Sequence, residues 1–498
     1  MTNHHIALRN NFDLIVVLTL SFGLLVASAI AGIFIAYPLL AALSMLVAAL
    51  LKRGFALSKL LKMGFTSAKQ ALPVVYILLL IGILTAVWTA AGTVPALVYY
   101  GTQLISPRFF ILWAFALSGG LSILIGTSFG TVGTIGVALI VIARSSHIAV
   151  NPVAGAIIAG AFVGDRCSPL SSSAHLVATI THTNLYDNLR NMVASSLWPL
   201  ALSVLFYAGL SLHQPQLTVQ IAESTAESTI ATELPKVFNL SLLSLLPAAV
   251  ILLLAIFRIN VRLAMLASIG TGFAIAHSLQ QVSLLSLFQF SLLGYQTNNP
   301  LLQSVLIGGG LLSMTKATIA VFISTAFAGI FSGSHLLSFA NAKLQSIQTC
   351  RQLSRTTTLT SIFANLFGCT QTIGILLTEQ VMRSHYQRHY SETANQQLAL
   401  AIEDTAVVTA PLIPWNIAGL IPATVLAVGP GCIPYMAYLI LLPLFSTIRP
   451  STIKPSTIEP STIEPSTIGA LRPKYLPLKK QSPTQPAAKA IPTKHLQQ

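Results

Sequence analysis

The chain of 498 residues has little charge and very few acidic side chains. Charged residues make up 8% of it, and Asp and Glu together number 12, whereas about a quarter of an ordinary soluble domain is charged. So few charged groups cannot cover a surface that faces water, but a composition that is 54% hydrophobic suits a surface that faces hydrocarbon. The composition therefore excludes a soluble globular protein and predicts a membrane protein.

The long apolar stretches lack the alternation of apolar and polar residues that strands of a transmembrane β-barrel show. They are continuous, as in residues 72–86 and 240–256. We therefore predict an all-α polytopic membrane protein with about ten to thirteen transmembrane helices, at ~20 residues for each span. Several apolar stretches are shorter than that, which predicts additional broken or re-entrant segments.

Motifs of ATP-driven and metal-dependent proteins are also missing. The four cysteines have neither the spacing of a metal site nor close pairing. The glycines of residues 130–136 lack the lysine of a phosphate-binding loop, so we expect them to allow close helix packing. The absence of an ATP motif favours secondary transport, and we expect no cofactor.

Basic residues gather between the second and third apolar stretches and again after Ser446. The first group contains no acidic residue; its members are Lys52, Arg53, Lys59, Lys62 and Lys69. Basic clusters beside membrane spans mark the cytoplasmic side. We therefore predict that both termini are cytoplasmic and that the protein lies in the cytoplasmic (inner) membrane. No folded soluble domain carries the net charge of +15, so this charge does not predict nucleic-acid binding.

An internal repeat divides the apolar part of the chain. Residues 129–139 align without gaps on residues 367–377, with six identities in eleven positions, and Ser-Pro-Leu at 168–170 matches Ala-Pro-Leu at 410–412. We interpret the match as a duplication and predict two inverted repeats with the substrate site between them. The predicted parts are residues 1–70 (two transmembrane helices and a basic cytoplasmic loop), 71–211 (first transport repeat), 212–237 (polar external loop), 238–447 (second transport repeat) and 448–498 (disordered cytoplasmic tail with Pro-Ser-Thr-Ile repeats).

Three acidic residues, Asp165, Glu403 and Asp404, lie within strongly apolar sequence. A charge at the centre of a bilayer costs from ~2.5 to more than ~10 kcal/mol, so an acid there needs a partner or a function. An ion pair of Asp165 with the adjacent Arg166 would require local unwinding, because neighbours on a helix point in different directions. Burial favours the neutral form of a carboxyl and a nearby cation favours the charged form. We therefore predict that the three acids bind a cation and a proton alternately.

Hydroxyl and amide side chains are concentrated near these acids, together with prolines. Hard cations prefer oxygen ligands, and a proline frees an upstream backbone carbonyl that can serve as one. A single Ser or Thr more often bonds back to its own helix, so it is the concentration that predicts a site. The predicted lining residues are Thr127, Ser128, Thr131, Thr134, Ser168, Pro169, Ser171, Ser172, His175, Asn365, Thr370, Gln371, Thr405, Thr409, Pro411, Trp415 and Asn416.

Three stretches of sequence carry a family resemblance. They are residues 88–100 (WTAAGTVPALVYY), residues 126–136 (GTSFGTVGTIG) with 164–171 (GDRCSPLS), and residues 403–416 (EDTAVVTAPLIPWN). Over most of residues 70–447 the chain resembles the NhaC family of Na+/H+ antiporters. The resemblance implies an inverted-repeat fold of ion-transporter type, sodium as the coupling ion, and protons or organic acids as the counter-substrate. Together with the acids it implies Na+ at Asp165 and Asp404.

The chain departs from the family pattern at two places. The family usually has Asp-Thr-Thr-Asn after Ser-Pro-Leu-Ser, where this chain has Ser172, Ser173, Ala174 and His175. The family pattern Asn-Leu-Phe-Thr-Ala-Asp-Gln corresponds here to residues 365–371 (NLFGCTQ), with Thr370 in place of the acid. Both halves have therefore lost a carboxylate.

Three functional hypotheses follow. The first is a secondary transporter that exchanges Na+ for H+. The second is a sodium-coupled exchanger of small organic acids, which the missing carboxylates and His175 favour because fewer fixed negative charges tolerate an anion. The third is a membrane-embedded enzyme, for which Asp165 with His175 is the nearest candidate pair; we expect that the chain is not an enzyme. Expected partners are the lipid bilayer, Na+, H+, an organic acid under the second hypothesis, and further copies of the chain in a homo-oligomer.

The prolines and polar residues also predict the local architecture. Helices should be interrupted near residues 164–171 and 409–415. The interruptions should bring Asp165 and Asp404 to one mid-membrane cavity, since two halves of an exchange site must share the ion.

Overall fold

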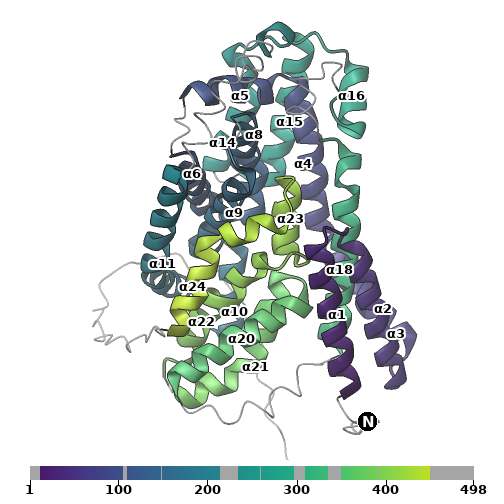
Figure 1. Cartoon of the computed structure of the whole chain (residues 1–498), viewed down its shortest axis with the longest axis vertical. Helices are drawn as coiled ribbons and strands as arrows, with labels where there is room; N and C mark the ends of the chain where they lie inside the picture. The colour runs from purple at the N-terminus through teal and green to yellow at the C-terminus, as the bar shows by residue number, and fades with distance from the viewer. Residues whose placement is uncertain are drawn as a thin grey trace, which may run out of the picture. The chain divides into compact units, whose positions relative to one another are not determined.

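The computed structural model describes residues 12–104, 109–146, 148–213, 234–257, 259–296, 309–334, 349–390 and 392–448. Within these ranges the chain is helical and contains no β-strand, which confirms the predicted all-α class (Figure 1). The predicted tail beyond residue 448 and most of the predicted polar loop at 212–237 lie outside the described residues.

The N-terminal part contains three helices rather than two helices and a loop. Helices α1 (Phe12–Ile30) and α2 (Ala36–Lys52) pack side by side (Figure 1). The predicted basic loop is largely a helix, α3 (Leu57–Gln70), which packs against α18 (Thr315–Gly333). Gly64 and Ser67 of this helix face α18, and the cytoplasmic placement of the connection stays a prediction.

The rest of the chain forms two long runs of helices. The first run is α4 (Leu72–Ala90), α5 (Thr93–Leu104), α6 (Phe110–Ile125), α7 (Ser128–Thr131), a π-helical turn (Val132–Gly136), α8 (Val137–Ser145), α9 (Val150–Cys167), α10 (Ser172–Thr181) and α11 (Leu185–His213). The second run is a 3₁₀ turn (Leu242–Leu245), α14 (Leu246–Ile256), α15 (Val261–Ser278), α16 (Leu284–Leu293), a 3₁₀ turn (Leu311–Met314), α18, α20 (Cys350–Gly368), α21 (Gln371–His389), α22 (Ala394–Thr409), a 3₁₀ turn (Ala410–Leu412), α23 (Ile417–Val425), a 3₁₀ segment (Pro430–Tyr435) and α24 (Ala437–Ile448).

Within the described residues, four helical segments are long and apolar enough to cross a membrane: Leu72–Ala90, Leu185–His213, Val261–Ser278 and Leu311–Gly333. Two bent helix pairs each meet the same criteria when counted as one span, which brings the number to six. Several shorter apolar helices accompany them. The count of about ten to thirteen spans stays a prediction.

The two bent pairs are the interruptions that the prolines predict. Helices α9 and α10 meet at 41°, and α22 with its 3₁₀ turn meets α23 at 49°. Each second helix begins at a polar cap: the Ser171 hydroxyl accepts a hydrogen bond from the Ala174 amide, and the Asn416 side chain accepts one from the Ala418 amide. Both predicted interruptions are therefore confirmed.

Two further helix breaks resemble one another in their capping. Their positions do not correspond in the alignment of the two predicted repeats. Helix α6 ends at Gly126 and α20 at Cys369, both with positive φ, and a threonine (Thr127 or Thr370) then caps the next helix. The apolar sequence of residues 357–378 is thus divided between α20 and α21. Phe129 lies two residues after its capping threonine, whereas Phe367 lies three residues before its own. The matched phenylalanines therefore do not occupy equivalent positions, and the inverted repeat stays a prediction.

In each half, the two breaks touch one another. The Ile417 amide donates to the Cys369 carbonyl at 2.9 Å, which joins the breaks of the second half. In the first half, Gly126 lies against residues 170 and 171, so closely that a Cβ on this glycine would be 2.6 Å from the Leu170 Cβ. Non-helical backbone is thus gathered in two places inside the protein, where buried polar backbone is tolerated at membrane depth.

Glycines allow α9 to approach α6 closely just before the first acid. A Cβ on Gly164 would lie 2.0 Å from the Ser122 carbonyl carbon, and one on Gly160 would lie 2.5 Å from the Phe115 carbonyl oxygen. Because backbone atoms cannot move aside as a flexible side chain can, this crossing fixes the position of Asp165.

We predict that Gly164→Ala separates α6 from α9 and destabilises the protein by about 1–3 kcal/mol, the usual effect of overpacking. The measurement is thermal unfolding of the detergent-purified protein. Gly120→Ala in α6 is the matched control, because nothing lies within 4 Å of its added Cβ. Equal unfolding temperatures for both variants would contradict the close crossing.

Candidate functional site

The three acids of the apolar sequence come together where α9 meets α22. Asp165 and Asp404 are 5% and 2% exposed, and Glu403 is fully buried. Asp404 forms an ion pair with Arg166, the residue next to Asp165. Asp165 and Asp404 therefore lie on adjoining helices, whereas a shared mid-membrane cavity stays a prediction.

The Asp165 carboxylate is surrounded by neutral groups. Its Oδ2 accepts a hydrogen bond from the Gln371 side-chain amide at 3.1 Å, and the Ser128 backbone amide and the Ser173 hydroxyl lie close to the carboxylate. Ser128 is the first residue of α7, so the carboxylate faces the positive end of a helix. Among the described residues, no ion pair is formed by Asp165. It is therefore held in place without a counter-cation.

Each of the two prolines frees a backbone carbonyl at this site. Pro169 has no N–H to bond the carbonyl of Asp165, four residues earlier, and Pro411 has none for the carbonyl of Val407. The Asp165 carbonyl instead accepts from the hydroxyls of Ser171 and Ser173, the latter at 2.8 Å. The Val407 carbonyl accepts from Gln371 Nε2 at 3.3 Å. Gln371 thus links a freed carbonyl of one half to the acid of the other.

Arg166 is the residue that the sequence prediction missed. Its guanidinium is fully buried and donates to the Asp404 carboxylate and, within 3.3 Å, to the Glu403 carbonyl, the Met192 carbonyl and the hydroxyl of Tyr438. The hydroxyls of Ser195 and Ser196 complete its hydrogen bonds. The anticipated alternative, an Arg166–Asp165 pair, does not form, because the Arg166 side chain reaches from α9 to α22. The feature of the sequence that could have identified Arg166 as a site residue is its position as an isolated arginine in an apolar stretch.

Glu403 has a different environment from its neighbour Asp404. Asp404 Oδ1 accepts from Arg166 and, at 3.0 Å, from the Ser195 hydroxyl. Both carboxylate oxygens of Glu403 are buried and have no hydrogen-bond partner among the described residues. An ionised carboxylate there would have lost its water without gaining a hydrogen-bond donor, and this environment favours a bound proton or cation.

Some of the other predicted lining residues serve the helix breaks. Asn365 donates to the Ala406 carbonyl at 2.8 Å and to the Thr409 hydroxyl at 2.9 Å. Trp415 donates to the Leu366 carbonyl at 2.8 Å, and the Asn416 side chain to the Asn365 carbonyl at 3.0 Å. These residues hold the second pair of breaks together rather than the carboxylates.

The remaining lining predictions are less well supported. The hydroxyls of Thr131, Thr134, Thr405 and Thr409 bond back to carbonyls of their own helices, and Ser168 accepts from the Leu170 amide. Ser172 and His175 are exposed, and the His175 ring bonds the Pro169 carbonyl at 3.0 Å. The structure therefore does not bring His175 into the site, because α10 turns its side chain outward.

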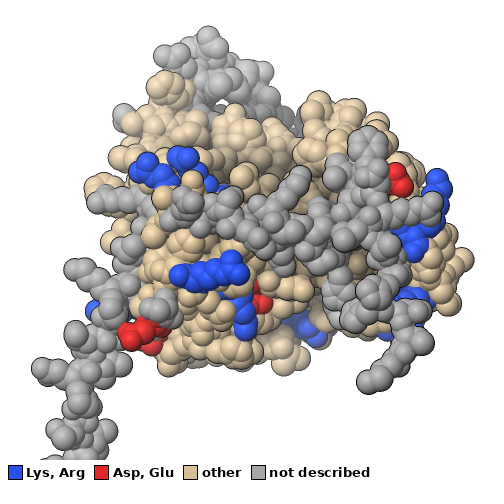
Figure 2. Space-filling view, turned by 90° about the horizontal axis from the view of Figure 1, so that it is seen from below, with Lys and Arg blue, Asp and Glu red and all other residues tan. Residues whose placement is uncertain are grey.

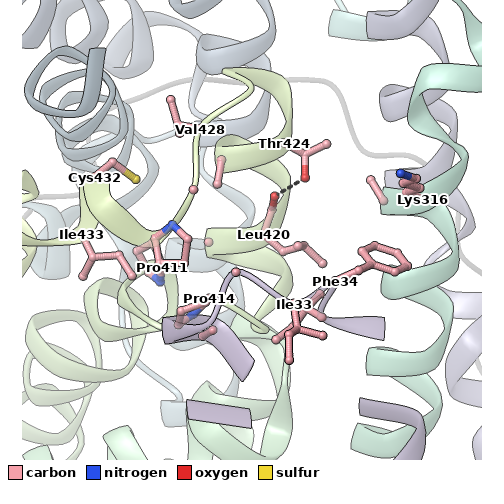
Figure 3. A pocket seen from close by; sticks show the side chains of 18 of the residues that line it. Ile33, Phe34, Lys316, Pro411, Pro414, Leu420, Thr424, Val428, Cys432 and Ile433 are labelled. Carbon is pink, nitrogen blue, oxygen red and sulfur yellow. Dashed lines mark hydrogen bonds between the residues drawn. The ribbon is translucent and has the colours of Figure 1, made fainter. Parts of the chain in front are cut away.

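Two cavities lie near these elements. A hollow of about 20 Å³ reaches Asp404 between Tyr386, Tyr390 and Gln397, which is room for one water molecule. A larger cavity of about 410 Å³ lies between the α1–α2 link, α18 and the second pair of breaks, with Pro411 and Pro414 on its wall (Figure 3). None of the three acids lines the larger cavity. Pro411 therefore faces this cavity and not the carboxylates.

Comparison with known proteins identifies the family of the chain. The sequence profile described as the Na+/H+ antiporter family matches residues 5–182 and 160–448. The chain belongs to the Na+/H+ antiporter family. It is therefore a cation antiporter and an integral membrane protein, and it is not an enzyme. Within the described residues of this antiporter, no three His, Cys, Asp or Glu side chains are grouped to hold a metal ion.

Curated relatives of this antiporter differ in what their names say they exchange. The chain is 29% identical over 379 residues to the Na(+)/H(+) antiporter NhaC of Alkalihalophilus pseudofirmus, covering 75% of this chain and 80% of the relative. It is 25% identical to the malate-2H(+)/Na(+)-lactate antiporter of Bacillus subtilis, covering 84% and 89%. It is 27% identical to the arginine/ornithine antiporter ArcD of Halobacterium salinarum, covering 77% and 79%.

We predict strong non-additivity between Arg166 and Asp404. Arg166→Gln or Asp404→Asn alone should destabilise the antiporter by about 3–5 kcal/mol, because each leaves a buried charge unpaired. The double variant should recover much of that loss. A double-mutant cycle of thermal unfolding in detergent measures the coupling.

The partly exposed pair Arg383–Glu379 is the control for this cycle, because its side chains are 39% and 12% exposed, more than those of Arg166 and Asp404. Its coupling should stay below about 1 kcal/mol. Equal coupling energies for the two pairs would contradict the role given to burial.

Proposed function

We propose that this antiporter exchanges Na+ for H+ across the cytoplasmic membrane, with Asp165 and Glu403 as the groups that bind cation and proton in turn. The observation that carries the proposal is the unpartnered, buried carboxyl of Glu403. Such a group satisfies its oxygens by binding a proton or a cation, and replacement of one by the other is the elementary step of exchange.

The neutral surroundings of Asp165 suit the second carrier. Amide and hydroxyl groups can rotate or exchange partners when a cation arrives, whereas a fixed guanidinium would compete with it. The freed carbonyls of Asp165 and Val407 add oxygen atoms close to this carboxylate, and Na+ is a hard cation that prefers such ligands. We therefore place the Na+ site at Asp165.

Asp404 takes a different role in this proposal. Arg166 already balances its charge, so a cation can bind there only after the ion pair opens. We propose that the pair holds α9 against α22 and that Asp404 acts as a positioning residue. This revises the sequence-based hypothesis of Na+ at Asp404.

Exchange of small organic acids is the second candidate function. The names of two relatives, a malate/lactate antiporter and an arginine/ornithine antiporter, show that organic ions are exchanged by proteins similar to this chain. Ser172 and Thr370 stand where the resembling family has acids, which removes two negative charges that would repel an organic anion.

Purified antiporter in proteoliposomes tests both candidates. With an imposed pH gradient, addition of Na+ should dissipate the gradient, and Glu403→Gln and Asp165→Asn should each slow this at least about a hundredfold, the lower end of the loss expected for a proton-transferring group. Glu379→Gln, which removes a carboxylate of a partly exposed ion pair away from the three acids, is the control and should exchange normally. Wild-type rates for Glu403→Gln would refute its role.

The same vesicles distinguish exchange of organic acids from exchange of Na+ for H+. Counterflow of labelled lactate, malate or arginine is measured beside the Na+-dependent pH change. Counterflow that requires Na+, with no pH change from Na+ alone, would replace the first candidate by the second.

A further inference from the structure

Helix α3 has an outer face with two adjacent stripes. The apolar stripe consists of Leu57, Leu61 and Phe65, which are 49%, 60% and 66% exposed. The basic stripe consists of the exposed Lys59, Lys62 and Lys69. Spacings of three, four and seven residues place each set along one side of a helix. This is the pattern of a helix that contacts hydrocarbon and anionic groups together.

The charge around α3 is of one sign. No acidic residue occurs in the sequence between Asp13 and Asp165, and among the described residues no ion pair is formed by the three lysines. Instead, Lys69 lies over the Phe65 ring, 4.8 Å from its centroid, and Lys59 lies 5.8 Å from the Phe55 centroid. Figure 2 shows that blue side chains exceed red ones on the face seen from below. The basic stripe is therefore available to an external anion.

The opposite face of α3 is firmly packed. Leu60 is fully buried, and glycines of α18 fit against α3: a Cβ on Gly329 would lie 2.2 Å from the Ser67 hydroxyl oxygen, and one on Gly333 would lie 3.0 Å from the Met63 sulfur. Figure 1 shows α3 beside α2 and α18 at the lower right. A shift of α3 would therefore be transmitted to α18 through direct packing contacts.

Helix α18 in turn reaches the helix breaks. The Ser324 hydroxyl lies 3.1 Å from the Trp415 carbonyl oxygen and 3.4 Å from that of Cys369, so one α18 side chain contacts both breaks of the second half. Packed side chains and hydrogen bonds thus form a continuous connection from the outer face of α3 to the second pair of breaks.

We propose that the outer face of α3 binds anionic phospholipid headgroups and that this binding stabilises the α3–α18 pair and promotes transport. An anionic membrane surface matches both stripes, because the lysines meet phosphate groups while Leu57, Leu61 and Phe65 enter the acyl boundary. An acidic soluble partner would leave the apolar stripe unexplained. The effect on transport rests on the proposed exchange function, whereas lipid binding does not.

Thermal unfolding of the full-length protein in detergent measures binding. Phosphatidylglycerol should raise the unfolding temperature of the wild type, and phosphatidylcholine should not. The triple variant Lys59→Gln/Lys62→Gln/Lys69→Gln should require at least about fivefold more phosphatidylglycerol for half of the effect, the contribution of one lysine near an anionic surface. Arg262→Gln/Arg351→Gln/Arg355→Gln removes three exposed charges elsewhere and is the matched control; it should respond as the wild type does.

Three outcomes would overturn the proposal: an unchanged response of the α3 variant, an equal loss in the control, or the same stabilisation by glycerol phosphate, which would indicate a site for soluble anions. In proteoliposomes, exchange by the wild type should rise with phosphatidylglycerol content, and exchange by the α3 variant should not. Absence of exchange in every liposome, with lipid stabilisation intact, would refute the proposed function and leave the lipid site standing.

Discussion

The ion pair between Arg166 and Asp404 is the interaction on which the rest of the site depends. One guanidinium joins α9 to α22 and, through Met192 and Tyr438, to α11 and α24. A buried arginine can be tolerated at such depth only if its charge is balanced and its five N–H groups have acceptors. Here both conditions are met. Because Asp404 is used for this purpose, Glu403 is left as a carboxyl without a donor.

The two prolines perform a second task at the same place. Each bends its helix, and each leaves a carbonyl four residues upstream without its helical partner. Both carbonyls, those of Asp165 and Val407, face polar side chains of the site, and Gln371 contacts one of them as well as the Asp165 carboxylate. In each half, one proline therefore both bends the helix and leaves a carbonyl oxygen free for the site.

The sequence allowed the membrane class, the two proline breaks and the proximity of the acids to be predicted, since each depends on local chemistry. It did not reveal which acid Arg166 would contact, because that depends on how α9 and α22 cross. The helical form of α3 was not predicted, because that segment was interpreted from its lysines and not from its buried Leu60 and Gly64. His175 was placed in the site by sequence proximity, whereas the direction of α10 turns it outward. The breaks at Gly126 and Cys369 contain no proline, so only backbone conformation reveals them.

Central to the proposed exchange is the release of a proton from Glu403 when Na+ binds. Infrared difference spectroscopy of the protein in liposomes, recorded on addition of Na+, tests this most directly. We expect loss of the carbonyl stretch of protonated carboxyls in the wild type and in the Arg166→Gln/Asp404→Asn double variant, and a clearly smaller loss in Glu403→Gln, in which only Asp165 can contribute. An unchanged loss of the band in Glu403→Gln would contradict the account.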